Sequence, residues 1–278
     1  MVDTDVGQRI RALRGERGWS MRTLAGRLGV SPGTVCAIEN GTTGVSVARL
    51  AELAEVFGMT PADLLQPNRV THPAAPMNST PGTHWRAFTP LDIDAVTAAA
   101  IAAFVDTGYH GSTMRAIAHR AGISLAGVYH YYPSKQLMLV TVLDLTMDDL
   151  EWRCQAAVAA GHTPLARLRS LVEALSLFHT LRADLAFIGS SEMRSLEEPD
   201  RSRIAARRSG IQHMVDREIL AAVDTGAARC PKPLETGRAI ATMCTSLPQW
   251  FDTAGPTSAV DIAAEYAALA LRMIGADG

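Results

Sequence analysis

Apolar residues in the first part of the chain recur at helical spacing, in short segments separated by glycine or hydroxyl residues. This pattern predicts helices over 6–17, 21–28, 32–39 and 46–57, and a short fifth helix that opens at Thr60-Pro61. Gly18, Gly41 and Gly58 follow helix ends, and Gly29 takes a tight turn. Ser20 and Ser31 stand at N-cap positions, and Pro32 occupies a first helical turn, where its missing N–H costs nothing.

A proline-rich stretch then interrupts the helical pattern. It contains Pro67, Pro73, Pro76, Pro81 and Pro90, with polar residues and glycine between them. Proline fixes φ and removes a donor, so this stretch is not a continuous helix. It predicts an interdomain linker over 67–88, and we expect Trp85 and Phe88 at its end to pack back onto the second domain.

The helical pattern resumes after the linker and continues to the end of the chain. We expect a helix capped by Thr89-Pro90 that reaches Asp106, helices over 114–121 and 125–131, and a long helix from Lys135. Further helices are predicted over 170–179, 185–196, 204–223, 235–251 and 258–274. No segment has the alternating pattern of a strand, so the predicted fold is all-α. The predicted domains are 1–66, the linker 67–88, 89–135 and 136–278.

Composition narrows the class of protein. Hydrophobic residues make up 47% of the chain and aromatic residues 5%, which suits helices with a full core. The net charge of −2 argues neither for nor against nucleic acid, because a DNA-binding face needs only local positive charge. The four cysteines are far apart and indicate neither a metal site nor a disulfide framework. Without a signal region or an apolar span, we expect a cytoplasmic protein that does not enter a membrane.

Residues 24–41 have the arrangement of a helix-turn-helix unit. Ala25 is a small residue where two helices would touch, and Gly29 lies in the turn between them. The unit and its flanking helices, over residues 5–66, resemble the Cro/cI-like (XRE) helix-turn-helix family. The resemblance implies a structural pair between Arg14 and Glu39.

The positions with which that family reads DNA are unusual in this chain. They hold Met21, Pro32, Gly33 and Ala37, none of which offers a bidentate contact to a base edge. The residues that remain for DNA, mainly for phosphates, are Arg22, Ser31, Thr34 and Asn40. The alternatives are a module that binds DNA weakly, one that recognises other DNA features, and one that contacts a protein.

Residues 112–139 form a second helix-turn-helix unit, which closely resembles the TetR family of regulators. The matching features include Ile117-Ala118, 121–124 (AGIS), 128–131 (VYHY) and Ser134-Lys135. The resemblance implies phosphate contacts by Tyr129 and Lys135, supported by Thr113 and Arg115, and a groove-facing surface on the second helix. Tyr131 is expected beneath that helix as a buried aromatic residue. The full DNA-binding set predicted for this unit is Thr113, Arg115, Ser124, Leu125, Ala126, Gly127, Tyr129, His130 and Lys135.

Residues 136–278 then correspond to the regulatory core of a TetR-like protein, in which the last two long helices form a homodimer interface. The C-terminal stretch resembles a TetR subgroup that includes regulators of fatty-acid and steroid breakdown, which respond to CoA thioesters. This resemblance implies an apolar ligand pocket and a site for CoA phosphates at the arginine group 201–208. The candidate pocket residues are Met138, Val142, Leu145, Phe178, Phe187, Met214 and Trp250.

Catalytic and metal-binding motifs are missing from the sequence, which contains no GxSxG, Walker A, HExxH or dinucleotide-binding motif. We therefore expect no enzyme activity, no metal and no cofactor. The predicted function is that of a homodimeric transcription factor, most simply a repressor, whose small-molecule effector releases it from a palindromic double-stranded operator. Two alternatives are an adaptor whose N-terminal domain docks a protein, and an architectural DNA binder with a solid core.

Overall fold

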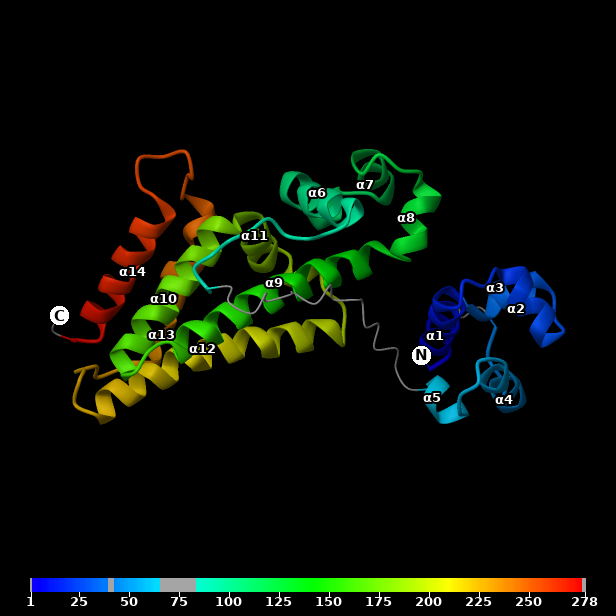
Figure 1. Cartoon of the computed structure of the whole chain (residues 1–278), viewed down its shortest axis with the longest axis horizontal. Coiled ribbons are helices and arrows are strands. Elements are labelled where there is room, and N and C mark those ends of the chain that lie inside the picture. Colours follow the sequence, from blue (N-terminus) through cyan, green and yellow to red (C-terminus); the bar gives the residue numbers. More distant parts are fainter. Residues whose placement is uncertain (1, 40–42, 66–83, 277–278) are drawn as a thin grey trace. The chain divides into compact units, whose positions relative to one another are not determined.

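The computed structural model describes residues 2–39, 43–65 and 84–276 (Figure 1). Within these ranges the secondary structure is helical and contains no strand, which confirms the predicted all-α class. The chain divides into two compact units, residues 1–73 and 74–278. Each unit is described by itself below.

The first unit contains α1 (Val2–Glu16), α2 (Met21–Leu28), α3 (Pro32–Glu39), α4 (Val47–Val56) and α5 (Pro61–Leu65). Helix α1 begins four residues earlier than the hydrophobic pattern predicts. Ser20 and Ser31 act as caps, because their hydroxyls accept hydrogen bonds of 3.1 Å from the backbone N–H groups of Thr23 and Thr34. Gly29 has a φ of 64°, which supplies the left-handed turn between α2 and α3. Gly41, the predicted stop of α3, lies outside the described residues.

One apolar core holds these helices together. Ile10, Leu24, Leu53 and Phe57 are completely buried in it. Helix α1 can pass close to α3 only because residue 7 is glycine, since a Cβ there would lie 2.4 Å from the carbonyl oxygen of Ile38. The close contact between α1 and α3 fixes the orientation of α3 within the first unit.

The second unit starts with α6 (Ala95–Gly111), α7 (Met114–Arg120), α8 (Leu125–Tyr131) and α9 (Lys135–Ala159). The prediction that Thr89-Pro90 caps α6 is wrong. Asp94 is the cap, because its Oδ1 accepts hydrogen bonds of 2.9 Å from the N–H groups of both Val96 and Thr97. Gly108 has a φ of 70°, so the regular helix is interrupted there, close to the predicted end.

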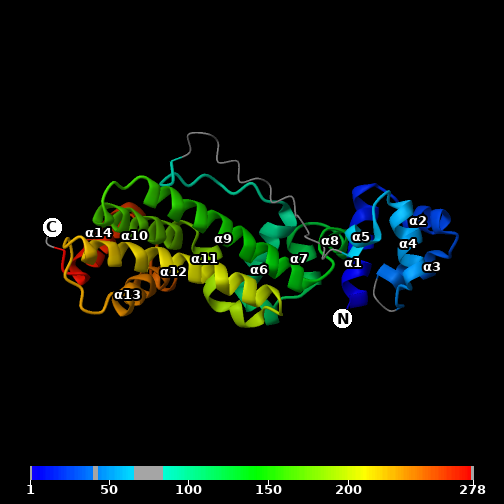
Figure 2. The ribbon, with the colours of Figure 1, turned by 90° about the horizontal axis from the view of Figure 1, so that it is seen from below.

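The remaining helices are α10 (Pro164–Leu181), α11 (Ala183–Ser191), α12 (Asp200–Asp224), α13 (Pro233–Thr245) and α14 (Ala259–Met273). Figures 1 and 2 show α9 and α12 side by side, with α6–α8 at the N-terminal end of α9. Helix α13 is shorter than predicted, because Pro248 lies in a separate 3-10 turn and removes a backbone donor. The predicted helix 185–196 also divides, into α11 and the 3-10 turn Met193–Ser195.

The segment that precedes α6 is attached to this helical core. Trp85 is only 3% exposed and packs among residues of α9, α10 and α14, which confirms its predicted position. The buried Arg153 donates hydrogen bonds from Nη1 to the carbonyl oxygens of Trp85, at 2.6 Å, and Ala87, at 3.0 Å. Its Nε forms an ion pair with Asp149 at 2.7 Å, which compensates the buried charge.

Candidate functional site

Helices α7 and α8 form a complete helix-turn-helix scaffold. Thr113 caps α7 by accepting a 3.1 Å hydrogen bond from the N–H of Ala116, and Ser124 caps α8 through the N–H of Gly127, also at 3.1 Å. Gly122 takes the turn with a φ of 69°. The scaffold therefore follows from local capping and turn chemistry, as the sequence predicts.

The residues predicted to contact DNA come from the N-terminal ends of α7 and α9 and from most of α8. Tyr129 is 42% exposed. Leu125 and Gly127 are half-buried, and the side chain of His130 lies outside the described residues. The predicted residues that are exposed are Thr113, Arg115, Ser124, Ala126 and Tyr129.

The prediction for Tyr131 is wrong, because this side chain is 61% exposed. The buried aromatic residue is its neighbour Tyr132, which lies just beyond α8, where the chain turns extended and directs the ring inward. The Tyr132 hydroxyl lies 2.6 Å from the hydroxyl of Thr97 and donates to Asp94 Oδ2 at 3.3 Å. These hydrogen bonds attach the end of α8 to the start of α6. Burial of the Tyr132 hydroxyl raises its pKa.

Lys135 has structural partners within the second unit. Its Nζ donates hydrogen bonds to the carbonyl oxygens of Tyr109, at 2.5 Å, and Ser112, at 2.7 Å, and lies 4.4 Å from the centre of the Tyr109 ring. Burial lowers the pKa of this ammonium group. Lys135 thus joins the start of α9 to the end of α6, and its predicted contact with phosphate stays a prediction.

Positive charge around α7 and α8 is sparse. Arg120 forms an ion pair with Asp106 at 2.6 Å. Arg115 is exposed and forms no ion pair among the described residues. Among the predicted contacts of this helix-turn-helix unit, Arg115 is therefore the arginine available to a phosphate group.

In the first unit the predicted pair of Arg14 and Glu39 is present. Nε of Arg14 donates to Glu39 Oε1 at 2.6 Å, and Nη2 donates to Oε2 at 2.9 Å. Nη1 also donates to the carbonyl oxygen of Trp19 at 3.0 Å, so the guanidinium joins α1, the α1–α2 turn and α3. The hydrogen bond to Glu39 raises the pKa of Arg14.

The predicted DNA-contacting residues of the first unit have mixed surroundings. Arg22 is exposed on α2, whereas the hydroxyls of Ser31 and Thr34 lie 2.9 Å apart and are used in the cap of α3. Asn40 lies outside the described residues. Arg27, which is not among the predicted residues, is also exposed on α2, with its guanidinium 4.2 Å from the centre of the Trp19 ring. Arg27 could have been selected from the sequence, because it lies on the same short helix as Arg22.

A cavity of about 340 Å³ lies among α9, α10, α11, α12 and α13. Of the predicted pocket residues, Phe178 lines it. Met138 and Val142 precede Leu143, the first residue of α9 that lines the cavity, and both are buried in the core. Leu145 lies between the lining residues Leu143 and Thr146 in sequence but is directed away from the cavity by the helix rotation. Phe187, Met214 and Trp250 also lie outside the lining. Its apolar part is formed mainly by Leu143, Met147, Leu150, Leu175, Phe178 and Ile204, and its polar part by Thr146, His179, Ser190, Arg208, Ser209, Gln212, Thr242 and Thr245.

Two of these polar residues carry groups that can be charged. Nδ1 of His179 lies 2.7 Å from the carbonyl oxygen of Leu175, which assigns the ring proton to Nδ1. Burial lowers the pKa of His179 to about 4, so the ring is neutral near pH 7. Nη1 of Arg208 donates to the carbonyl oxygen of Gly189 at 3.1 Å. Arg208 is exposed at the mouth of the cavity, although partial burial lowers the pKa of its guanidinium. No aspartate or glutamate is among the described lining residues.

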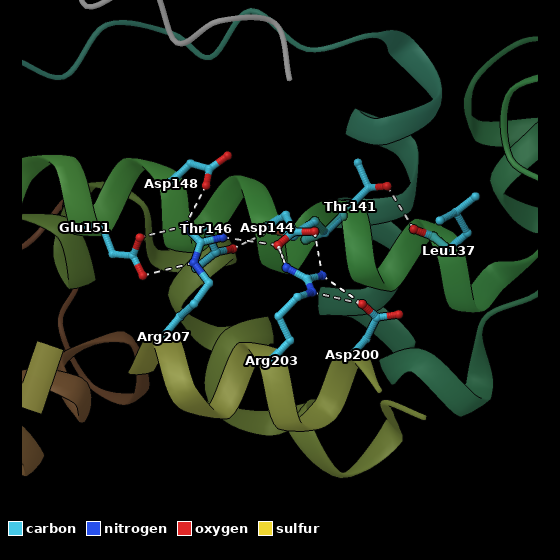
Figure 3. A network of polar contacts seen from close by, with 10 residues as sticks. Leu137, Thr141, Asp144, Thr146, Asp148, Glu151, Asp200, Arg203 and Arg207 are labelled. Atoms are coloured by element: carbon cyan, nitrogen blue, oxygen red, sulfur yellow. Dashed lines mark hydrogen bonds and ion pairs between the residues drawn. The ribbon is translucent and has the colours of Figure 1, made fainter. Parts of the chain in front are cut away.

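The other arginines of the 201–208 group do not combine into the expected phosphate site. Figure 3 shows Arg203 and Arg207 directed at acidic residues of α9. Arg203 binds Asp144 at 2.5 Å, and Arg207 binds Asp148 at 2.6 Å and Glu151 at 2.8 Å. These ion pairs join α9 to α12 and leave Arg208 at the cavity.

The cavity adjoins the contact between the core and the helix-turn-helix unit. Gly189, Ser190 and Met193 line it. Between them in sequence lies Glu192, whose Oε1 accepts a 3.1 Å hydrogen bond from the backbone N–H of Tyr109. A ligand that displaces this wall of the cavity would therefore act on the end of α6.

A second hollow, of about 450 Å³, lies near the turn between α9 and α10 and is lined in part by Leu165, Leu271 and Ala276. It lies at the opposite end of α9 from α7 and α8. It therefore lacks the connection to Tyr109 that the smaller cavity has through Glu192, the residue beside the lining residue Met193.

The last two helices present apolar side chains to solvent as well as to the core. Leu234 on α13 is 52% exposed, and Val260 and Met273 on α14 are 66% and 42% exposed. The small residues Ala263, Ala267 and Ala270 are instead buried within the unit. None of the described helices combines the length and the apolar character that crossing a lipid bilayer requires.

Three family descriptions match the chain. Residues 96–142 match the bacterial regulatory proteins of the tetR family, and residues 161–274 match the tetracyclin repressor-like C-terminal domain. Residues 5–66 match a helix-turn-helix domain. Together they cover both helix-turn-helix units and the helical core.

Individual proteins support these matches. The chain is 36% identical to the transcriptional repressor KstR of Mycolicibacterium smegmatis over 69 residues, which are 25% of this chain and only 34% of KstR. The structure of the ketosteroid transcriptional regulator KstR2 of Mycobacterium tuberculosis superimposes with a TM-score of 0.63 at 25% identity, covering 68% of this chain and 98% of KstR2. AibR, in a complex described as containing isovaleryl coenzyme A and operator DNA, has a TM-score of 0.60 at 23% identity over 66% of this chain and 98% of AibR. The likeness to AibR shows the fold alone.

Proposed function

Since the chain belongs to the TetR family of DNA-binding transcriptional regulators and carries an additional XRE-like helix-turn-helix domain, we propose that it is a ligand-responsive homodimeric repressor. A small, largely apolar effector binds in the 340 Å³ cavity and releases the protein from a palindromic operator. The observation that carries this proposal is the hydrogen bond from Tyr109 to Glu192, which joins the helix-turn-helix unit to the wall of the cavity.

Release follows from a shift between two arrangements of the second unit. The effector favours an arrangement in which the α11 end of the cavity, and with it Glu192, is displaced. Tyr109 then moves with Glu192, and α7 and α8 turn relative to α9. In a dimer, two such units must fit major-groove half-sites about 34–36 Å apart, so a small rotation is enough to lose the operator. The effector shifts the equilibrium only by its preference for the DNA-incompetent arrangement.

DNA contacts in this proposal come from α7, α8 and the start of α9. Arg115, Thr113 and Tyr129 bind phosphate groups and set the position of the unit on DNA. Leu125 and Ala126 contact thymine methyl groups in the major groove, and Gly127 allows close approach of the backbone. The contacts proposed for Ser124 and His130 complete this surface, and Lys135 holds it in place by joining the start of α9 to the end of α6.

Dimerisation is proposed to use α13 and α14. Leu234, Val260 and Met273 supply exposed apolar area on these two helices. Repression, rather than activation, is supported by the similarity to the transcriptional repressor KstR. AibR shows that a protein of this fold can hold a CoA thioester and operator DNA in one complex.

The domain limits proposed here are 1–66, a linker 67–88, a DNA-binding part 89–135 and a regulatory part 136–278. For the N-terminal domain we propose a second, weaker contact with DNA through Arg22, Ser31, Thr34 and Asn40. Docking of a protein partner is the alternative, because Met21, Pro32, Gly33 and Ala37 offer no bidentate contact with a base. The cavity in the core argues against an architectural DNA binder with a solid core.

The experiment begins with the full-length protein and a random DNA pool. Binding selection should return a palindrome, and sedimentation should give a mass of twice 29.7 kDa. Mass spectrometry of small molecules that copurify with the protein supplies candidate effectors, and each is tested for release of the selected DNA. A monomer, a non-palindromic site, or DNA binding unchanged by every cavity ligand would contradict the proposal. An unchanged footprint after removal of residues 1–66 would indicate that the N-terminal domain docks a protein.

A further inference from the structure

We propose that the effector is an amphipathic carboxylate, held with its chain in the apolar part of the cavity and its carboxylate against Arg208. This inference rests on the proposed effector-binding function and specifies its chemistry. It differs from the CoA thioester that the sequence predicts, because it requires a single anionic group beside the apolar part and no separate site for several phosphates.

The charge of the cavity supports this assignment. Arg208 is the permanently charged residue among the described lining residues, and no acidic residue accompanies it there. Among the described residues, its guanidinium donates a hydrogen bond to the neutral carbonyl oxygen of Gly189 and forms no ion pair. An arginine with this environment favours a ligand that brings a negative charge, and a planar carboxylate suits the fork of donors of a guanidinium.

The neighbouring arginines provide an internal comparison. Arg203 and Arg207 lie on the same helix as Arg208 but are neutralised by Asp144, Asp148 and Glu151 of α9 (Figure 3). The helix thus has acidic partners for the arginines that join it to α9, and none for the arginine that lines the cavity. Because of this difference, Arg208 is the arginine of the helix that can bind an anionic ligand in the cavity.

The uncharged imidazole ring of His179 lines the same cavity. Its Nδ1–H is used by the carbonyl oxygen of Leu175, and the ring lies close enough to Arg208 for the guanidinium to disfavour a second positive charge. The cavity therefore offers one positive charge, which matches one carboxylate. CoA carries several phosphate charges, and the described lining of the cavity offers one cationic side chain to neutralise them.

The size of the cavity points to the same ligand class. Its volume of about 340 Å³ is at the lower end of the range of about 300–1,000 Å³ that is typical of small-molecule pockets. Leu143, Met147 and Phe178 form part of an apolar lining suited to a hydrocarbon chain or ring. A medium-length acid uses both the apolar and the charged part, whereas its CoA thioester replaces the carboxylate with a neutral thioester.

The test uses the full-length dimer and equilibrium dialysis with radiolabelled octanoate, decanoate and dodecanoate, each below its micelle concentration. The methyl esters of the three acids and decanoyl-CoA are the matched ligands without a free carboxylate. We expect at least one of the acids to bind roughly tenfold or more tightly than its methyl ester. Arg208→Met should remove this preference, and Arg208→Lys should restore part of it.

Arg217→Met is the matched control, because Arg217 lies on the same helix, is exposed and does not line the cavity. Ala241→Phe fills the cavity and should abolish binding of all the acids. Equal binding of acid and ester, tighter binding of decanoyl-CoA than of decanoate, or no binding of any acid would overturn the inference. So would a preference for the acid that persists in Arg208→Met, or acid binding that survives Ala241→Phe. If the ester or the thioester binds and releases DNA, the carboxylate inference fails while the proposed function stands. If decanoate binds through Arg208 and DNA is retained, the proposed function fails instead.

Discussion

Oε1 of Glu192 accepts a 3.1 Å hydrogen bond from the backbone N–H of Tyr109, and both residues are buried. The N–H belongs to the residue after Gly108, where the regular α6 helix is interrupted. Residue 108 has a φ of 70°, a left-handed conformation that favours glycine. On the other side of Tyr109, its carbonyl oxygen accepts from Lys135. One peptide segment is thus held by the cavity wall and by the start of α9.

Replacing Glu192 should uncouple effector binding from DNA release. We expect Glu192→Ala to bind the effector normally. In the unmodified protein the effector should lower DNA affinity by roughly five- to a hundredfold, and most of this decrease should disappear in the variant. The reason is that Tyr109 then has no connection to the cavity wall through this side chain. The measurement is operator affinity with and without saturating effector.

Two further variants make this test specific. Glu192→Gln keeps an acceptor oxygen for the Tyr109 N–H and should retain most of the coupling. Glu197→Ala removes an exposed carboxylate nearby and should behave like the unmodified protein. Wild-type coupling in Glu192→Ala would show that the signal takes another route.

Arg115 and Lys135 should affect DNA binding in different ways. Arg115→Ala should weaken binding to all sequences and reduce the slope of log K against log salt concentration by about 0.9 per lost phosphate contact. Lys135→Ala should weaken binding mainly by loosening the joint between α6 and α9, and the salt slope should change little. Salt-titrated anisotropy with a labelled operator measures both quantities.

Tyr129→Phe completes this series, since it removes a hydroxyl without removing charge, and should lower affinity for all sequences equally. Arg120→Ala is the control for Arg115→Ala, because Arg120 is already paired with Asp106. A reduced slope for Lys135→Ala together with an unchanged slope for Arg115→Ala would reverse the two roles.

The pair of Arg14 and Glu39 should dominate the polar stabilisation of the first unit. We expect Glu39→Gln to lower the free energy of unfolding of this unit by about 2–4 kcal/mol, because it leaves a largely buried guanidinium without its charged partner. Hydrogen exchange of α1 and α3 amides reports on this unit separately from the second. Glu52→Gln breaks the exposed pair with Arg49 and should cost less than about 1 kcal/mol. Equal effects of the two changes would refute this ranking.

His179 should make the second unit less stable in mild acid. Its pKa is lowered from 6.5 to about 4 in the folded protein by burial. Between these values the unfolded chain binds more protons than the folded one, so the stability contribution is complete above about pH 6.5 and is lost as the pH falls toward 4. The full difference corresponds to roughly 3 kcal/mol.

The test compares urea unfolding of the wild-type protein and His179→Gln at a series of pH values. The difference between the two free energies of unfolding should change by roughly this amount across the window, while other titrating groups cancel. A constant difference from pH 7 to pH 4 would mean that the ring is protonated in the folded protein at its ordinary pKa.

Local chemistry explains the parts of the structure that the sequence predicts well. Ser31 caps α3 through an N–H three residues away, and Gly29 supplies a left-handed turn, so both act within a few bonds of their own position. The family resemblance added the long-range pair of Arg14 and Glu39, which a local pattern does not reveal.

Local signals predicted the wrong residue at two places in the second unit. Thr89-Pro90 has the residue types of a helix start, but the cap is Asp94, which binds two backbone N–H groups and also receives the Tyr132 hydroxyl. Tyr131 and Tyr132 differ by a single position. The backbone turns extended after α8, and this turn buries Tyr132 and exposes Tyr131.

The sequence by itself determined the all-α fold, the two helix-turn-helix scaffolds and the break between the units, because helix periodicity, caps and prolines act locally. Tertiary structure decided which arginines are paired with acidic residues and where the cavity lies. Arg203, Arg207 and Arg208 share one helix and one residue type, yet α9 neutralises the first two and leaves Arg208 beside the cavity. The cavity is bounded by several helices whose rotations about their axes are set by mutual packing. Those rotations also bring Glu192 to Tyr109, a contact between residues far apart in the chain.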